Sequence, residues 1–440
     1  MLLIYTPHIT NRVNYIMQYM FEERLGIEFA ITNNKELFIA DNSIFKIAYS
    51  NKHIQTGLNF FAEQLLFEED IKPLKIKNAI YENINILFCN DETSALPFDI
   101  FASTFYMLSR YEEYLDTPKD KFDNYDCRKS ILYKLNILHI PVVEQWIELL
   151  KQALLKNFPF LQYKEEKAKF GLSFDIDIAY AYKNRSIIRS AGGIIKKIFT
   201  LNFSETKNQL LTLLNKKEDM FDTYNYIFSS IKNKRPIVFF DMGKYGKFDK
   251  NPSVKNKKFR ELIISVSQKA IVGLHPSYTS NTKKYLVRDE KNILEEIIQK
   301  PVTASRQHYL KLKMPETYNT LISNGIKYDY TLGYSPMYGF RTGTCNSFLF
   351  FDLIKNEATQ LRLYPFACME VTLNNYLKLS IEEAKKIISE LIETTCRYKG
   401  IFIPIWHNST LCNCGEWEGW RNVFEYMLEE IDNKKAENIF

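Results

Sequence analysis

The sequence predicts an α/β protein in which about seven parallel strands close into a (β/α) barrel, preceded by a smaller α/β domain. The chain has 440 residues, more than the roughly 250 to 300 that one hydrophobic core serves, so two domains are expected. Strand-like and helix-like segments alternate after residue 169, as they do in parallel sheets. Several of these strands end in acidic or histidine side chains, and such folds carry their chemistry at that edge.

The first predicted domain spans residues 1–163, and the charged segment KEEK at 164–167 marks its end. The expected strands are 1–6, 27–31, 37–40, 45–49 and 84–88, and the expected helices are 11–25, 97–114 and 141–158. Residues 116–140 are expected to be irregular. No cluster of catalytic side chains is recognisable in this domain, so its role stays open.

The second predicted domain spans residues 164–440. Its expected strands are 170–175, 236–241, 271–275, 301–305, 326–330, 361–365 and 401–405, and its expected helices are 257–269, 283–299, 315–324, 380–398 and 417–431. Helices between strands indicate a parallel arrangement, and closure into a barrel is the natural solution for this number of strands.

Composition excludes several classes of protein. Hydrophobic residues make up 46% and charged residues 25% of the chain, as in globular domains, so disorder is not expected. The net charge of +6 arises from 58 basic and 52 acidic residues spread along the chain, so we expect no nucleic-acid partner. No apolar run approaches 18 residues and the N-terminus lacks signal-peptide features, so no membrane span is expected. Seven scattered cysteines favour reduced thiols and a cytoplasmic location.

The stretch KFGLSFDIDIAY, residues 169–180, is the first candidate for chemistry. An alternating apolar run ends in Asp175 and Asp177, so a buried strand would deliver two carboxylates to its C-terminal edge. Alternation places both on one face of the strand, roughly 6 to 7 Å apart, where one could hold a metal while the other handles a proton. The alternative is a polar strand end or helix cap.

Histidines supply the second candidate. The chain has six, and three of them, His275, His308 and His407, fall at or just beyond predicted strand ends. A lone histidine is more often a hydrogen-bonded structural residue, but this grouping favours function. Asp and His together suit a divalent metal such as zinc, with one position left for water.

From Lys169 to Glu430 the order of motifs resembles the NodB-homology polysaccharide deacetylases, which hydrolyse N- or O-acetyl groups from sugars on a distorted (β/α) barrel. The matching segments are SFDID, HPSYT, RQHY and IPIWHNS. The whole chain is similar to the long, two-domain members seen in Bacteroidetes-type bacteria, through YTPHITNRVNYI, SRYEEYL, YDYTLGY, GFRTGT and WHNS.

The resemblance implies a role for each matching residue. It implies Asp175 as the base, Arg306 as the residue that orients this base, and His407 as the general acid. It further implies that Asp177 and His275 bind the metal, and that the backbone at Tyr309 helps to bind the oxyanion. Substrate contacts are expected from Tyr309, Arg341 and Trp406, although a structural turn at 339–344 is an alternative.

Two positions depart from the family pattern. Thr279 stands where the second histidine of the family's HxxxH motif is expected, so the usual Asp-His-His metal site is incomplete. His308, where the family usually has proline, would replace the missing ligand or would face the substrate. Glu370 stands where an aspartate is expected, and its role stays open.

The sequence therefore predicts a hydrolase that uses a divalent metal, with zinc as the expected ion, to remove acetyl groups, N-acetyl first, from a sugar or polysaccharide. The alternative is a carbohydrate-binding protein that has kept the barrel and lost its metal, as Thr279 suggests. A third class is an interaction module acting through residues 1–160. The identity of the sugar and the oligomeric state stay open.

Overall fold

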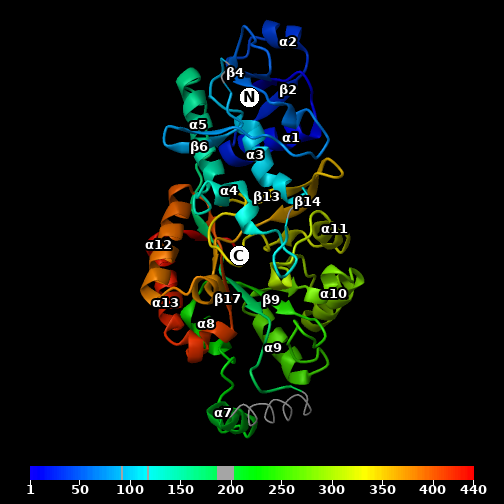
Figure 1. Cartoon of the computed structure of the whole chain (residues 1–440), viewed down its shortest axis with the longest axis vertical. Helices are drawn as coiled ribbons and strands as arrows, with labels where there is room; N and C mark the ends of the chain where they lie inside the picture. Colours follow the sequence, from blue (N-terminus) through cyan, green and yellow to red (C-terminus); the bar gives the residue numbers. More distant parts are fainter. Residues whose placement is uncertain (91–92, 116–117, 186–202) are drawn as a thin grey trace. The chain divides into compact units, whose positions relative to one another are not determined.

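The computed structural model describes residues 1–90, 93–115, 118–185 and 203–440 (Figure 1). The chain forms two compact units. Unit 1 comprises residues 1–120, 125–167 and 340–365, and unit 2 comprises residues 121–124, 168–339 and 366–440. The division into domains at residues 163 and 164 remains a prediction. The structure adds that residues 340–365, which lie far along the chain, belong to unit 1.

Unit 1 contains a parallel sheet with the strand order β2-β1-β3-β4. Its strands are β1 (Leu2–Tyr5), β2 (Phe29–Thr32), β3 (Lys46–Ser50) and β4 (Leu58–Phe61). Two antiparallel hairpins are β5 (Asn78–Tyr81) with β6 (Ile84–Leu87), and β13 (Phe348–Asp352) with β14 (Glu357–Leu363). The helices include α1 (Asn11–Met17), α2 (Lys35–Ala40), α3 (Ile100–Leu108), α4 (Ile131–Lys134) and α5 (Val142–Asn157).

Two strand predictions in unit 1 are wrong. Residues 37–40, predicted as a strand, form part of helix α2, because the Asn34 side chain accepts a hydrogen bond from the Leu37 N–H and starts a helix there. Residues 361–365, predicted as a parallel barrel strand, overlap β14, which pairs antiparallel with β13. Residues 116–140, expected to be irregular, contain the short helix α4, while residues 116 and 117 lie outside the described residues.

Unit 2 carries a larger sheet in which β12, β11, β10, β9, β8, β17 and β15 are neighbours in that order. All of these pairings are parallel. The strands are β8 (Ser173–Ile176), β9 (Ile237–Asp241), β10 (Ile271–His275), β11 (Ala304–Ser305), β12 (Tyr328–Asp329), β15 (Cys368–Met369) and β17 (Pro404–His407). A second small sheet has the order β16 (Ile401–Phe402), β7 (Lys169–Phe170), β18 (Glu437–Asn438).

Helices connect these strands. They are α7 (Phe203–Leu213), α8 (Tyr224–Ser230), α9 (Lys257–Ser267), α10 (Tyr285–Ile298), α11 (Glu316–Ser323), α12 (Ile381–Arg397) and α13 (Trp420–Asn433). Helix α12 begins at a capping box in which the Ser380 side chain accepts from the Glu383 N–H and Glu383 accepts from the Ser380 N–H. It lies beside α13 (Figure 1). Over the described residues, no helix is both long and apolar enough to cross a bilayer.

The predicted α/β class with a parallel sheet is confirmed. Closure into a barrel is not seen, because no strand pairing between described residues joins β12 to β15 at the two ends of this arc. One backbone hydrogen bond, from the Phe366 N–H to the Leu332 carbonyl at 2.9 Å, links the segments beside those strands. Because the strands are parallel, their C-terminal ends meet at one edge of the sheet, and this edge carries the candidate site.

Candidate active site

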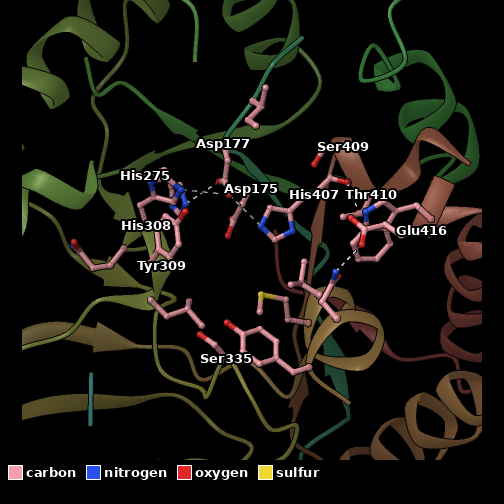
Figure 2. A pocket seen from close by; sticks show the side chains of 18 of the residues that line it. Asp175, Asp177, His275, His308, Tyr309, Ser335, His407, Ser409, Thr410 and Glu416 are labelled. Carbon is pink, nitrogen blue, oxygen red and sulfur yellow. Dashed lines mark hydrogen bonds and ion pairs between the residues drawn. The ribbon is translucent and has the colours of Figure 1, made fainter. Parts of the chain in front are cut away.

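A cavity of about 680 Å³ in unit 2 lies at the C-terminal ends of β8, β10 and β17. Its lining gathers most of the predicted site residues, together with Lys121, Gln307, Tyr376, Glu416 and Trp417. Figure 2 shows Asp175, Asp177 and three histidines around this space. The strand register accounts for part of this arrangement, because His407 lies opposite Asp175 in the pairing of β17 with β8.

Asp177 is at the centre of the group. Its Oδ1 lies 3.1 Å from the Nε2 of His275, and its Oδ2 lies 3.4 Å from the Nε2 of His308 and 3.6 Å from the Nε2 of His407. The dashed lines in Figure 2 mark these pairs. Burial raises the pKa of Asp177, but the charges of His308 and His407 outweigh burial and hold this pKa well below its usual range. Asp177 is therefore a carboxylate at neutral pH.

His275 is held so that its Nε2 faces Asp177. Its Nδ1 lies 2.6 Å from the backbone carbonyl oxygen of Arg306. A carbonyl can only accept, so Nδ1 carries the hydrogen, and in the neutral ring the lone pair on Nε2 then faces a carboxylate oxygen. That contact is repulsive unless a proton or a cation lies between the two atoms. Asp177 Oδ1 has no hydrogen-bond partner among the described residues, so this donor set suits a bound cation.

His308 completes a three-residue group with Asp177 and His275, whose potential ligand atoms all lie within 4.8 Å of one another. Its Nδ1 lies 2.9 Å from the Asp249 carboxylate, which fixes the ring and leaves Nε2 toward Asp177. Burial lowers the pKa of His308, but Asp177 and Asp249 together raise it well above its usual range. Thr279, by contrast, does not line the cavity.

His407 enters the cavity from the side opposite His275 and His308 (Figure 2). Its Nδ1 lies 2.7 Å from Glu370 Oε1, and that oxygen also accepts hydrogen bonds from the His407 N–H and the Thr410 hydroxyl. Burial lowers the pKa of His407, but the Glu370 and Asp177 carboxylates raise it to about 10. His407 is therefore protonated at neutral pH in the metal-free protein.

Arg306 is fully buried and holds Asp175. Its Nη1 donates to Asp175 Oδ1 at 2.7 Å, its Nη2 donates to the Ser173 hydroxyl at 2.8 Å, and its Nε donates to the Tyr330 carbonyl at 3.0 Å. Three fixed donors and the Phe239 ring, 4.6 Å from the guanidinium carbon, leave this side chain one orientation. Asp175 is thereby aimed into the cavity beside Asp177.

Of the three predicted substrate-binding residues, only Tyr309 lines the cavity. Tyr309 lines the cavity and has a φ of 58°, a conformation that is uncommon for a non-glycine residue and often occurs at functional sites. Trp406 is buried, packs on Phe424 and is not part of the lining. Arg341 belongs to unit 1, where it is buried and paired with Glu113.

Sequence reasoning missed two residues that position the histidines. Asp249 lies in the segment after β9 and had no distinguishing neighbour in the sequence. Glu370 was noted without a role, and the structure places it against His407. Both contacts join segments far apart in the chain, so no local pattern could have indicated them.

Comparisons with known proteins were made for the whole chain. A family model described as "Family of unknown function (DUF7033)" matches residues 2–159. No curated protein matches the chain. Among solved structures, a polysaccharide deacetylase from Bacillus cereus is 13% identical with a TM-score of 0.30, over 62% of this chain and 90% of its own.

Two further solved structures are similar in part. The Puue allantoinase is 7% identical with a TM-score of 0.41, over 62% of this chain and 87% of its own. A CE4 family pseudoenzyme from Bacillus anthracis is 11% identical with a TM-score of 0.27, over 62% of this chain and 64% of its own. At these scores the likenesses settle neither the fold nor the activity of this chain.

Proposed function

We propose that this protein is a metal-dependent hydrolase that removes acetyl groups, N-acetyl groups in the first instance, from a sugar or polysaccharide. The observation that carries the proposal is the arrangement around Asp177. Two histidine Nε2 atoms, of His275 and His308, converge on its carboxylate while oxygen acceptors hold their other ring nitrogens. This is how metal-binding histidines are usually oriented. The motif order described above supports the acetylated sugar as the substrate.

Asp177, His275 and His308 would hold the ion. One carboxylate and two imidazoles suit zinc and leave a position open, so zinc is the expected metal. When bound, such an ion lowers the pKa of a water molecule and polarises the acetyl carbonyl. The chain's own residues then have to accept one proton, donate another and hold the substrate.

Asp175 would accept the proton of the attacking water, in the orientation that Arg306 imposes. His407 would donate a proton to the leaving nitrogen, for which it must be protonated beforehand, and the Glu370 carboxylate against Nδ1 raises the pKa of His407 and favours the protonated ring. The backbone N–H of Tyr309 would stabilise the oxyanion. Water and the acetamide are consumed, and acetate and a free amine are released.

The proposal also assigns a domain organisation and a barrel fold to the chain. Residues 164–440, apart from the segment 340–365 that belongs to unit 1, would form the catalytic domain as a distorted (β/α) barrel, and residues 1–163 would form an α/β domain whose role is open. The arc of parallel strands from β12 to β15 supports the barrel, together with the hydrogen bond between Phe366 and Leu332.

The test combines metal analysis with acetate release. Purified protein is loaded with zinc and incubated with N-acetylglucosamine oligomers. We expect one zinc per chain, and we expect a chelator to remove both the zinc and the release of acetate. Asp175→Asn should keep its zinc and lose turnover, which separates the base from the metal ligands.

A second candidate function is a carbohydrate-binding protein without catalysis. The threonine at position 279 favours it, because the family's usual second histidine is missing there. Binding of sugar with no metal under any loading condition would support this candidate and contradict the hydrolase.

A further inference from the structure

A second cavity in unit 2, of about 470 Å³, adjoins the candidate active site. The two cavities share one lining residue, Gln307. The second cavity lies among the segment before α10, the residues that follow His308, and helix α11. Its charged lining consists of Asp123, Lys284, Lys311, Lys313 and Glu316.

Gln307 offers an unused donor at this shared wall. The side chain is 1% exposed, and its Oε1 accepts a hydrogen bond from Asn281 at 3.2 Å. Its Nε2 has no hydrogen-bond partner among the described residues. Buried amide N–H groups are nearly always paired, so a ligand with acceptor oxygens is expected at this wall.

Lys311 places a positive charge in the second cavity. Its side chain is 12% exposed, and its Nζ lies 4.3 Å from the centroid of the Tyr278 ring and donates to the Tyr278 hydroxyl at 3.2 Å. Its carboxylate partner, Asp123, is 3.7 Å away and largely exposed to solvent, so this ion pair is weak. A cation that is held out of water with so weak a partner attracts a second anion.

The remaining charges give the cavity a positive excess. Lys313 is paired with Glu316 at 3.0 Å, whereas Lys284 forms no ion pair with any described residue. The lining therefore contains three lysines and only two carboxylates. Lys121, in the lining of the first cavity, adds a further positive charge.

Aromatic rings pack between Tyr309, in the lining of the first cavity, and Lys311, in the lining of the second. Tyr309 lines the first cavity, and its ring centroid lies 5.5 Å from that of Tyr278, over which Lys311 sits. Phe248 and Phe122 extend this group, at 5.3 and 5.0 Å from Tyr309. Tyr309 is half-buried and lines the first cavity, so its ring is suited to packing against the apolar face of a sugar.

We infer that the substrate is an acidic glycan, in which a sugar next to the acetylated residue carries an anionic group that binds in the second cavity. This inference rests on the proposed function for its acetylated residue. Lys311, Lys284 and Gln307 would bind the anionic group, and Tyr309 would support the intervening sugar. A carboxylate and a phosphate share the required chemistry, and the experiment distinguishes them.

The experiment measures binding by calorimetry with the full-length, metal-free chain, so that no turnover is needed. The probes are a hexasaccharide of alternating N-acetylglucosamine and glucuronate, a phosphorylated N-acetylglucosamine hexamer, and the neutral hexamer. We expect one acidic probe to bind at least about tenfold more tightly than the neutral one, with an advantage that shrinks at high salt. The preferred acidic probe identifies the anion.

Lys311→Met and Lys284→Met should each lower the affinity for the preferred acidic probe, and the double variant should remove its advantage. Lys257→Met is the matched control, because Lys257 is 90% exposed on α9 and lines neither cavity, and it should change nothing. Equal affinities for acidic and neutral probes, or an advantage that survives in the double variant, would overturn the inference. Acetate release is scored separately. If no acetate is released, the hydrolase is refuted, but a lysine-dependent preference for the acidic probe still stands. If all probes are turned over equally, the hydrolase is supported and the preference for an acidic glycan is overturned.

Discussion

A buried glutamate in unit 1 and a half-buried aspartate in unit 2 are both surrounded by basic side chains, and these side chains differ in kind. Glu113 accepts hydrogen bonds from Arg110 at 2.9 Å and from Arg341 at 2.6 and 2.9 Å. Asp177 faces three histidine nitrogens at 3.1 to 3.6 Å, and its Oδ1 has no hydrogen-bond partner among the described residues.

The kind of basic side chain distinguishes a structural ion cluster from a candidate metal site. Arginine is always protonated and binds a carboxylate with a rigid fork, so the Glu113 cluster is satisfied as it stands. Histidine can release its proton and offer the freed nitrogen to a metal, so the Asp177 group, unlike the Glu113 cluster, can exchange protons for a metal cation. The Glu113 cluster also joins the motifs SRYEEYL and GFRTGT, which gives Arg110 and Arg341 a structural role in unit 1.

The largest expected effect comes from Asp177→Asn, which removes the charge at the centre of the site. We expect zinc binding to be lost and acetate release to fall by on the order of a thousandfold, more than the roughly 10- to 100-fold typical of residues that only orient a ligand. Metal analysis and acetate assays measure both. The midpoint of thermal unfolding should fall as well, because His308 and His407 lose the carboxylate that offsets their charges, so the zinc content is measured per folded chain. A variant that keeps full zinc content would contradict the site.

Glu113→Gln tests whether the ion cluster in unit 1 stabilises the fold without contributing to metal binding. Removing one partner of a buried ion cluster leaves two arginines without their shared carboxylate, so the free energy of unfolding should fall by about 3 to 5 kcal/mol. Denaturant titration gives this value. The zinc content per folded chain should match that of the parent, and a loss of zinc at full stability would show that the Glu113 cluster belongs to the site.

His308→Ala sharpens the comparison within unit 2. If His308 is the third ligand, zinc affinity should fall by well over tenfold, since only Asp177 and His275 remain. Zinc titration against a competing chelator measures the change. Normal zinc affinity with only a raised KM would assign His308 to the substrate instead.

The smallest effect is the pH dependence of the Glu113 cluster. Burial raises the pKa of Glu113, but Arg341 and Arg110 outweigh burial and lower it from 4.5 to about 2. The folded state thus binds this proton more weakly than the unfolded state, so the stabilisation is complete above pH 4.5 and is lost as the pH falls toward 2. The stability difference between the parent and Glu113→Gln should therefore narrow between pH 5 and 3, as measured by urea titration at each pH. A constant difference would mean that the carboxylate is not ionised in the folded protein.

Much of the fold could be predicted because the strands of unit 2 carry local signals. The segments 237–241 and 271–275 form strands nearly as predicted, and the helices at 285–298 and 381–397 follow their amphipathic spacing. The segment 361–365 was misassigned to a parallel strand because the pairing of β14 with β13, and not its composition, decides its direction, and β13 itself was not predicted. The short helix α2 depended on one capping asparagine, which is a weak signal beside an apolar run.

The candidate site was predictable to the extent that its residues end strands. Asp175, His275 and His407 did so, and parallel pairing brings such ends together. Asp249 and Glu370 could not be found in this way, because each is defined by a hydrogen bond to a histidine distant in the chain. The same holds for Arg341, whose partner Glu113 is 228 residues away.

That separation also has a consequence for synthesis on the ribosome. Unit 1 is assembled from residues 1–120, 125–167 and 340–365, so its N-terminal part emerges long before the segment that completes it. At about 5 to 20 residues per second, translation from residue 167 to residue 365 takes on the order of 10 to 40 seconds. During this interval Glu113 has Arg110 but not Arg341, and the nascent N-terminal part has to wait, incomplete, while most of unit 2 is being made.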